Sequence, residues 1–223
     1  MIYPFDSAQV LTDSIFTSYG GQTGTSTSFQ REAAYFIAEE WMSNYLNTSI
    51  VPATITGTYA YPYIQSTVQL DYAYLQNVKT IKFLDNKDYA YYTITGLDNY
   101  HAAIRNPDRS IIDIFDIYGN CSACGNGIAP YKFQIVYEAG LPTGTYTAKN
   151  FLLALTEAAQ IVVNEVQGWG NESSGGVGIS EFRNQEYSEK RTPIIESVFG
   201  NSPKAKWITK LVQNIRKRMI VGL

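Results

Sequence analysis

The C-terminal half of the chain has an order of elements that narrows its possible folds. Residues 131–142 (YKFQIVYEAGLP) alternate polar and apolar side chains as a strand does, and they end in a turn. An apolar helix is predicted from about Ala148 to Gln167, and residues 168–178 (GWGNESSGGVG) follow as a glycine hinge. A polar segment and a basic helix complete this arm, residues 168–223. A monomeric globular protein rarely needs a long hinged arm with a charged end, whereas a subunit that binds its neighbours in an assembly does.

The first 54 residues are predicted to be mainly helical. A short helix is expected over residues 7–17, ended by Gly20 and Gly21. A second helix is expected from Ser28, a candidate N-cap, to about Asn47, and Pro52 ends any continuation. Its predicted apolar face is formed by Phe29, Ala33, Phe36, Ile37, Trp41 and Tyr45.

From Ile55 the hydrophobic period changes from that of a helix to two, the period of a strand. Val68, Leu70, Tyr72 and Tyr74 share one predicted strand face. Residues 85–88 form a predicted turn and residues 101–107 a predicted loop. The strands are expected over residues 67–75, 77–84, 89–94, 110–118 and 131–138.

This order of helices, then strands, then helices predicts an α+β fold. We expect a helical-bundle framework with an inserted antiparallel β module and an extended C-terminal arm that ends in a helix. The predicted parts are N-terminal helices over 1–54, the β module over 55–140, a central helix over 141–167, and the hinge and arm over 168–223.

Charge is distributed unevenly along the chain. From Ser197 to Leu223 there is no acidic residue and there are six cations. Since the whole chain has a formal net charge of −3 and this end carries +6, residues 1–196 carry −9. Such asymmetry indicates an acidic partner surface or a channel lined by nucleic acid, although the whole chain is not a basic nucleic-acid binder. We expect no signal peptide and no membrane span, and we expect a reducing cytoplasm as the site of synthesis.

Cys121 and Cys124 have the spacing of half a zinc knuckle or of a thiol redox pair. The second half of a zinc site is missing, and His101, the single histidine, lies in another predicted loop. A metal site, a disulfide and two free thiols all stay open for this pair.

The acidic residues do not form a recognisable catalytic pattern. Asp113 and Asp116 are three apart on or beside a strand, which places them on opposite faces. Glu39, Glu40 and Glu165 are expected to be solvated on helices. We therefore predict that the chain is not an enzyme and has no catalytic, cofactor or metal site.

The arm carries the predicted partner-binding site. Its basic helix is amphipathic, so its cations form either a solvated face or a surface that docks on an acidic neighbour or on DNA phosphates. Trp207 favours docking, because an aromatic side chain beside cations is typical of an interface anchor. The candidate residues are Arg183, Tyr187, Arg191, Ile194, Phe199, Lys204, Lys206, Trp207, Lys210, Arg216, Lys217 and Arg218.

Residues 136–142 (VYEAGLP), followed by an apolar helix that contains alanines, resemble the head–tail connector proteins of tailed bacteriophages, also called adaptor or head-completion proteins. Tyr137, Ala139 and Gly140 match that family's tyrosine–x–alanine–glycine strand end. Residues 151–166 match the helix that follows it, and the first two predicted helices fit the family's opening. The likeness covers most of residues 1–167 in order of elements and about a dozen residues in detail.

The resemblance implies a structural virion protein that forms an oligomeric ring, commonly of twelve copies, which joins the portal to the tail and lines the DNA exit channel. Its implied partners are other copies of the chain, the portal protein, and tail or further ring proteins. DNA would pass without sequence-specific binding, and no cofactor or membrane is implied. The implied location is the head–tail junction of the virion, after assembly in the host cytoplasm. Two other readings stay open: a β-rich module that recognises a glycan or receptor through exposed aromatic residues, and an enzyme of unknown class.

Overall fold

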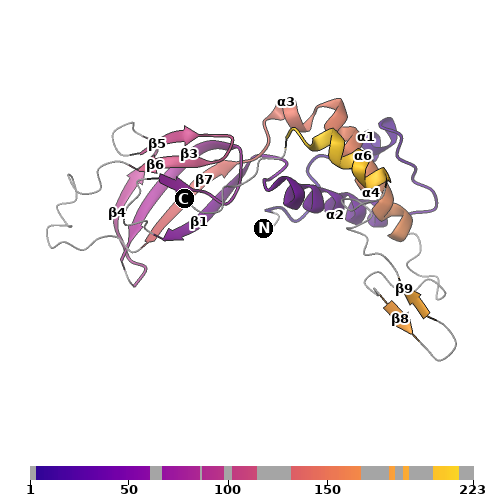
Figure 1. Ribbon diagram of the computed structural model, residues 1–223, viewed down its shortest axis with the longest axis horizontal. Helices are drawn as coiled ribbons and strands as arrows, with labels where there is room; N and C mark the ends of the chain where they lie inside the picture. The colour runs from indigo at the N-terminus through magenta and orange to yellow at the C-terminus, as the bar shows by residue number, and fades with distance from the viewer. Residues whose placement is uncertain are drawn as a thin grey trace. The chain divides into compact units, whose positions relative to one another are not determined.

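The computed structural model describes residues 4–60, 67–85, 87–97, 102–114, 132–166, 181–183, 188–190 and 203–215. These residues fall into two compact units (Figure 1). The β unit consists of described residues from Asn47–Pro142, and the helical unit of described residues from Phe5–Leu46 and Thr143–Arg216. The α+β class with antiparallel sheets and a C-terminal helix is confirmed.

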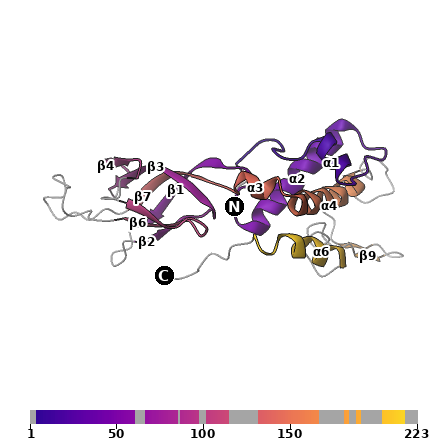
Figure 2. The ribbon, with the colours of Figure 1, turned by 90° about the horizontal axis from the view of Figure 1, so that it is seen from above.

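The β unit contains two antiparallel sheets. The four-stranded sheet has the order β1-β7-β3-β4, and the three-stranded sheet has the order β2-β6-β5. Figure 2 labels strands of both sheets. The strand bounds are β1 Ala53–Ala60, β2 Thr67–Gln69, β3 Leu75–Leu84, β4 Ala90–Thr95, β5 Ala102–Asn106, β6 Ile111–Ile114 and β7 Lys132–Ala139.

Alternation along the strands sends one set of side chains from each sheet into a shared core. The central strand β7 buries every second residue, from Phe133 to Ala139, and exposes the others in part. Phe83 of β3 meets Phe133 edge to face, with ring centroids 5.1 Å apart. The opposite sheet contributes Val68 and Ile112 to the same core. The other face of the four-stranded sheet is polar and rich in threonine.

One strand prediction and one loop prediction were wrong. The strand expected over residues 67–75 ends at Gln69, and the chain bends until β3 begins at Leu75, with Tyr74 at a positive φ of 61°. The loop expected over 101–107 contains β5, because pairing with β6 holds its alanines in the sheet. The strand expected over 110–118 is present as Ile111–Ile114, and residues 115–118 lie outside the described part.

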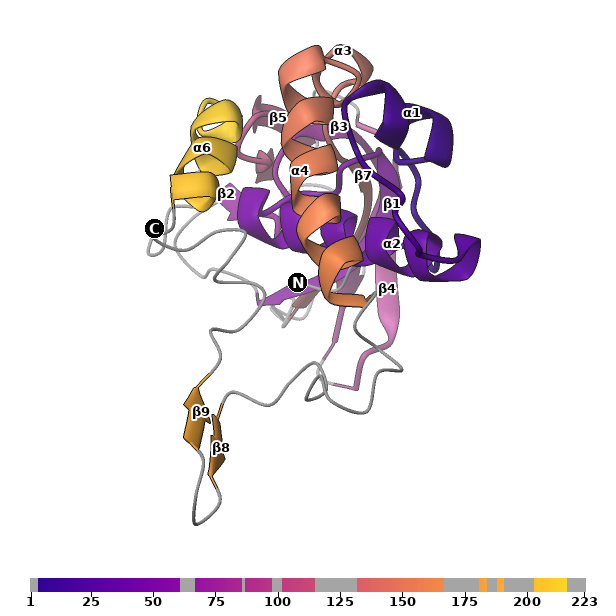
Figure 3. The ribbon, with the colours of Figure 1, turned by 90° about the vertical axis from the view of Figure 1, so that its right-hand side faces the viewer.

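The helical unit is built around two long helices, α2 Ser28–Leu46 and α4 Lys149–Val166. α4 packs against both α2 and α6, which runs over Pro203–Val212 (Figure 3). Its broad apolar stripe is buried as the sequence predicted, from Phe151 to Val163. The remaining elements are α1 Asp13–Ser18, α3 Thr143–Tyr146, and the short paired strands β8 Glu181–Arg183 and β9 Ser188–Lys190. No helix in the described residues is both long and apolar enough to cross a membrane.

The prediction of a helical-bundle framework overestimated the helix content, because the described residues are richer in strands than such a framework. α1 has six residues and α3 four, so each is little more than one turn, and strands outnumber helices in the described residues. Short helices of this kind gain little from their own hydrogen bonds and depend on packing.

Helix α2 differs from its prediction in two ways. Thr27, not Ser28, is its capping residue, because Gln30 N–H donates to Thr27 Oγ1 at 3.2 Å and Thr27 N–H donates to Gln30 Oε1 at 2.8 Å. Its fully buried face contains Tyr35, Ala38, Met42 and Leu46, whereas the predicted positions other than Phe29 are half-buried. Phe29 of the predicted face is 78% exposed.

Candidate partner-binding site

Helix α6 carries those candidate residues whose side chains the structure describes: Lys204, Lys206, Trp207 and Lys210. Arg183 is described only as backbone of β8. The other candidates, Tyr187, Arg191, Ile194, Phe199, Arg216, Lys217 and Arg218, lie outside the described residues. The predicted glycine hinge over 168–178 lies outside them as well.

The inner face of α6 is an integral part of the helical unit. Ala205, Ile208 and Val212 recur at steps of three and four, are fully buried, and lie on the side of α6 that packs against α4. Lys204 adds an ion pair, with its Nζ 2.7 Å from Oε2 of Glu157 on α4. The basic helix therefore contacts its own chain through one face, and only the remaining face is available to a partner.

The outer face of α6 combines two cations with an aromatic ring. Lys206, Trp207 and Lys210 lie within about 100° of the helix circumference, given 3.6 residues per turn. Both lysines are exposed, and Trp207 is 39% exposed. Two ammonium groups beside a partly exposed indole suit an acidic surface on another protein, where the ring provides apolar area and the lysines provide charge.

Tyr137 of the tyrosine–x–alanine–glycine strand end lies in a buried network within the β unit. Its hydroxyl is 3.2 Å from that of Tyr59, and Tyr59 donates to Oδ2 of Asp71 at 3.1 Å. Burial raises the pKa of Tyr137 to about 12 and raises that of Tyr59 further. Both hydroxyls are therefore neutral near pH 7, and the network ties β1 to β7.

Ala139 and Gly140 have steric roles in the same strand end. Ala139 is fully buried and pairs with Ala53 on one side and Leu75 on the other. Gly140 has a φ of 153°, and a Cβ at this position would lie 2.7 Å from the backbone of Pro52. The motif recognised in the sequence is therefore explained by close packing where β7 ends.

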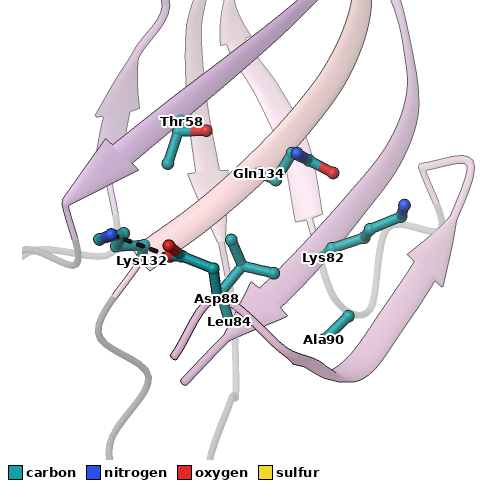
Figure 4. A pocket seen from close by; sticks show the side chains of 7 residues that line it. All are labelled: Thr58, Lys82, Leu84, Asp88, Ala90, Lys132 and Gln134. Atoms are coloured by element: carbon teal, nitrogen blue, oxygen red, sulfur yellow. Dashed lines mark hydrogen bonds and ion pairs between the residues drawn. The ribbon is translucent and has the colours of Figure 1, made fainter. Parts of the chain in front are cut away.

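A polar hollow of about 460 Å³ lies on the outer face of the four-stranded sheet (Figure 4). Lys132 of β7 and Asp88 form an ion pair at one side of it, with Nζ 2.8 Å from Oδ1. The lining contains no aromatic side chain, whereas the glycan-binding reading relied on aromatic residues. Its lining residues are Thr58, Lys82, Leu84, Asp88, Ala90, Lys132 and Gln134.

The prediction that Glu39 is solvated was wrong. Glu39 is fully buried in the helical unit, and its carboxylate accepts three backbone hydrogen bonds, from Gln9 at 2.7 Å, Val10 at 2.8 Å and Leu11 at 2.7 Å. Glu40 is half-buried, and the side chain of Glu165 is outside the described part. Burial of Glu39 is tolerated because charge-assisted hydrogen bonds replace its hydration.

A second polar cluster connects α1 to α2. Arg31 donates to both carboxylate oxygens of Asp13, at 2.9 and 2.6 Å, and Tyr35 donates to Asp13 Oδ1 at 2.8 Å. Hydrogen bonding from Arg31 lowers the pKa of Asp13 from 3.8 to about 2. Burial, followed by its bond to Asp13, raises the pKa of Tyr35. These groups are satisfied by one another and stabilise the helical unit.

Most of the other residues that the sequence analysis considered for chemistry lie outside the described part of the chain. His101, Cys121, Cys124 and Asp116 lie outside the described residues. Asp113 on β6 accepts a hydrogen bond from Thr67 at 2.7 Å, and so has a structural partner. Among the described residues, no three His, Cys, Asp or Glu side chains are grouped as metal ligands.

Searches of protein-family models and of curated proteins found no match to this sequence. Solved structures of gene transfer agent particles do match its fold. The neck of an empty particle computed with C6 symmetry matches with a TM-score of 0.55 at 12% identity, covering 96% of this chain and 92% of that one. The neck of a native particle computed with C12 symmetry gives 0.51 at 12%, covering 100% and 95%.

A chain in the virion of the native gene transfer agent particle gives a TM-score of 0.56, again at 12% identity, with 100% of this chain and 95% of that one covered. At this identity the likeness establishes a shared fold. The resemblance to head–tail connectors, first seen in the strand end, is confirmed at that level.

Proposed function

We propose that this chain is a structural virion protein of the head–tail junction of a phage-like particle. In this proposal identical copies form a ring that joins the portal to the tail and lines the channel through which DNA leaves. The observation that carries the proposal is the fold likeness to two neck structures and one virion structure, which extends over at least 92% of both chains in each comparison.

The proposed ring has twelve copies. The C12 symmetry of one matched neck supports this number, and the C6 symmetry of another is compatible with it. A cyclic ring requires each subunit to present two different surfaces to its neighbours. The separate β and helical units offer such surfaces, and their order along the chain supports a β module inserted between segments of a helical framework.

The proposed partner-binding site is the arm, and α6 is its best-defined part. The outer face formed by Lys206, Trp207 and Lys210 would dock on an acidic surface of the portal or of an adjacent copy. The candidates beyond the described residues extend the same proposal. A net charge of −9 over residues 1–196 supports passage of DNA without tight binding, because phosphate contacts dominate DNA affinity.

The proposal includes no catalytic step and no cofactor. It places the chain in the virion after assembly in the host cytoplasm, with tail or further ring proteins as additional partners. The buried carboxylate and tyrosines found in the structure have hydrogen-bond partners that account for their positions.

Co-purification with the portal protein of the same particle tests the proposal. The full chain should retain the portal, and the combined change Lys206→Glu, Trp207→Ala and Lys210→Glu should weaken retention at least tenfold. Lys149→Glu is the matched control, since Lys149 is an exposed lysine at the start of α4. If the unchanged chain binds no portal, or if the triple variant binds as well as the control, the proposed role of the arm is wrong.

A further inference from the structure

Strand β1 is an edge strand without the protection that the other edges have. It pairs only with β7 among the described strands, through eight residues in unbroken register from Ala53 to Ala60. Its sequence, ATITGTYA, contains no charge and no proline. An edge of this kind is a template on which another strand can pair.

The three other edges in the β unit are each blunted. β2 has only three residues. β4 carries one unpaired residue, Tyr91, where its register against β3 shifts. β5 has a bulge at Arg105, a charged residue that faces no residue of β6 in the register. Short length, bulges and charge are the usual features that prevent strand addition. Among the described edge strands of the β unit, β1 is the one that has none of them, so it is the edge best suited to pair with another strand.

The backbone of β1 is oriented for such pairing. Gly96 N–H donates to Lys79 O on the β4 side of β3, so the even-numbered residues of β3 that follow Lys79 bond to β7, where the register pairs them with even-numbered residues. Because these directions alternate along a strand, odd-numbered residues of β7 bond to β1. The register pairs them with odd-numbered residues of β1, so Thr54, Thr56 and Thr58 direct their N–H and C=O groups away from β7.

We propose that β1 is a strand-addition site and that its occupant is an extended segment of the adjacent copy of this chain. This inference rests on the proposed ring, which places a second copy beside every subunit. The occupant would be a segment other than β1, because β1 paired with another β1 makes a two-fold contact that closes as a dimer. Main-chain hydrogen bonds would provide the affinity, as in other cases of strand addition.

The test compares Thr56→Pro with Thr56→Val in the full chain. Proline removes the outward N–H of residue 56 while leaving the hydrogen bonds to β7, and edge strands tolerate it. Valine keeps that N–H and removes only the hydroxyl. We expect Thr56→Pro to enter particle necks at least tenfold less than the unchanged chain, and Thr56→Val to enter normally.

Amide hydrogen exchange of the unchanged chain provides a second readout, which holds even if Thr56→Pro does not fold. The amides of residues 54, 56 and 58 should exchange at least tenfold more slowly in assembled necks than in the free chain. Equal exchange in both states, or equal incorporation of both variants, overturns the strand-addition site and leaves the proposed function intact. Absence of the unchanged chain from necks overturns the proposed function itself.

Discussion

Glu39 illustrates how a single side chain organises the helical unit. Its carboxylate binds the backbone amides of Gln9, Val10 and Leu11, which are 28 to 30 residues away in sequence. No local pattern distinguishes it from the neighbouring Glu40. The sequence could not predict this role, because the donors are backbone groups that are brought to Glu39 only by the folded chain.

Glu39→Gln should lower the free energy of unfolding of the helical unit by about 1–3 kcal/mol, since the new amide NH₂ would face at least one backbone N–H that has lost its acceptor. Urea denaturation followed by circular dichroism measures this loss. Glu40→Gln, at the half-buried neighbour, is the control and should lower this free energy by less than Glu39→Gln does. Equal effects of both changes would contradict the importance of the buried carboxylate.

Gly140→Ala should destabilise the β unit by about 2 kcal/mol or more, because its φ of 153° disfavours a side chain and the new Cβ would clash with Pro52. Gly144→Ala is the matched control, since a Cβ at residue 144 meets no atom within 4 Å. The control should be neutral or stabilising by up to about 1 kcal/mol. Thermal unfolding of both variants measures the difference, and a stable Gly140→Ala chain would show that the strand end tolerates a side chain.

Asp13 should make stability depend on pH in the acid range. Its pKa is about 2 in the folded chain and 3.8 without its partners. A lowered folded pKa stabilises the fold above the higher value, and this contribution is lost as the pH falls through about 2. Asp13→Asn should therefore be less stable than the unchanged chain at pH 7, by no more than about 1 kcal/mol because Asp13 is half exposed. The difference should shrink as the pH falls below 3.8 and vanish only below about pH 2. A difference that stays constant from pH 7 to pH 2 would contradict this assignment.

At the scale of elements, the sequence predicted those segments whose periodicity reflects burial on one face. The stripe of α4 and the alternation of β7 are of this kind. The sequence did not predict the end of β2 at Gln69, because Leu70 and Tyr72 are buried without belonging to a strand. It also missed β5, whose place in the sheet depends on pairing with β6 rather than on its own residues.

For helix α6, the sequence predicted the helix itself but not the residue with which Lys204 forms an ion pair. Its amphipathic pattern predicted the helix, and the partner of Lys204 could not be predicted because Glu157 lies 47 positions earlier on another helix.

Ile208→Ala should lower the free energy of unfolding of the helical unit by about 2 kcal/mol or more, since Ile208 is fully buried on the face of α6 that packs against α4. Lys210→Ala should change it by less than about 0.5 kcal/mol. Equal losses in chemical denaturation would mean that α6 does not pack by this face in solution.

At the scale of the whole molecule, the fold is shared with solved gene transfer agent structures over nearly the whole chain. The order of elements and one short strand-end motif resembled the head–tail connectors, and the fold matches chains of two particle necks and of a virion at only 12% identity. In this chain the strand-end residues Ala139 and Gly140 are constrained by close packing. Partner surfaces are less constrained by the subunit's own packing, so the arm and its individual contacts stay predictions.

The most direct test of the central claim is cryo-electron microscopy of intact particles in which this chain carries a small N-terminal label. We expect labelled density in a closed ring at the junction of head and tail, into which the β and helical units fit. A label found on the capsid surface or at the tail tip, or particles that contain no copy of the chain, would contradict the account.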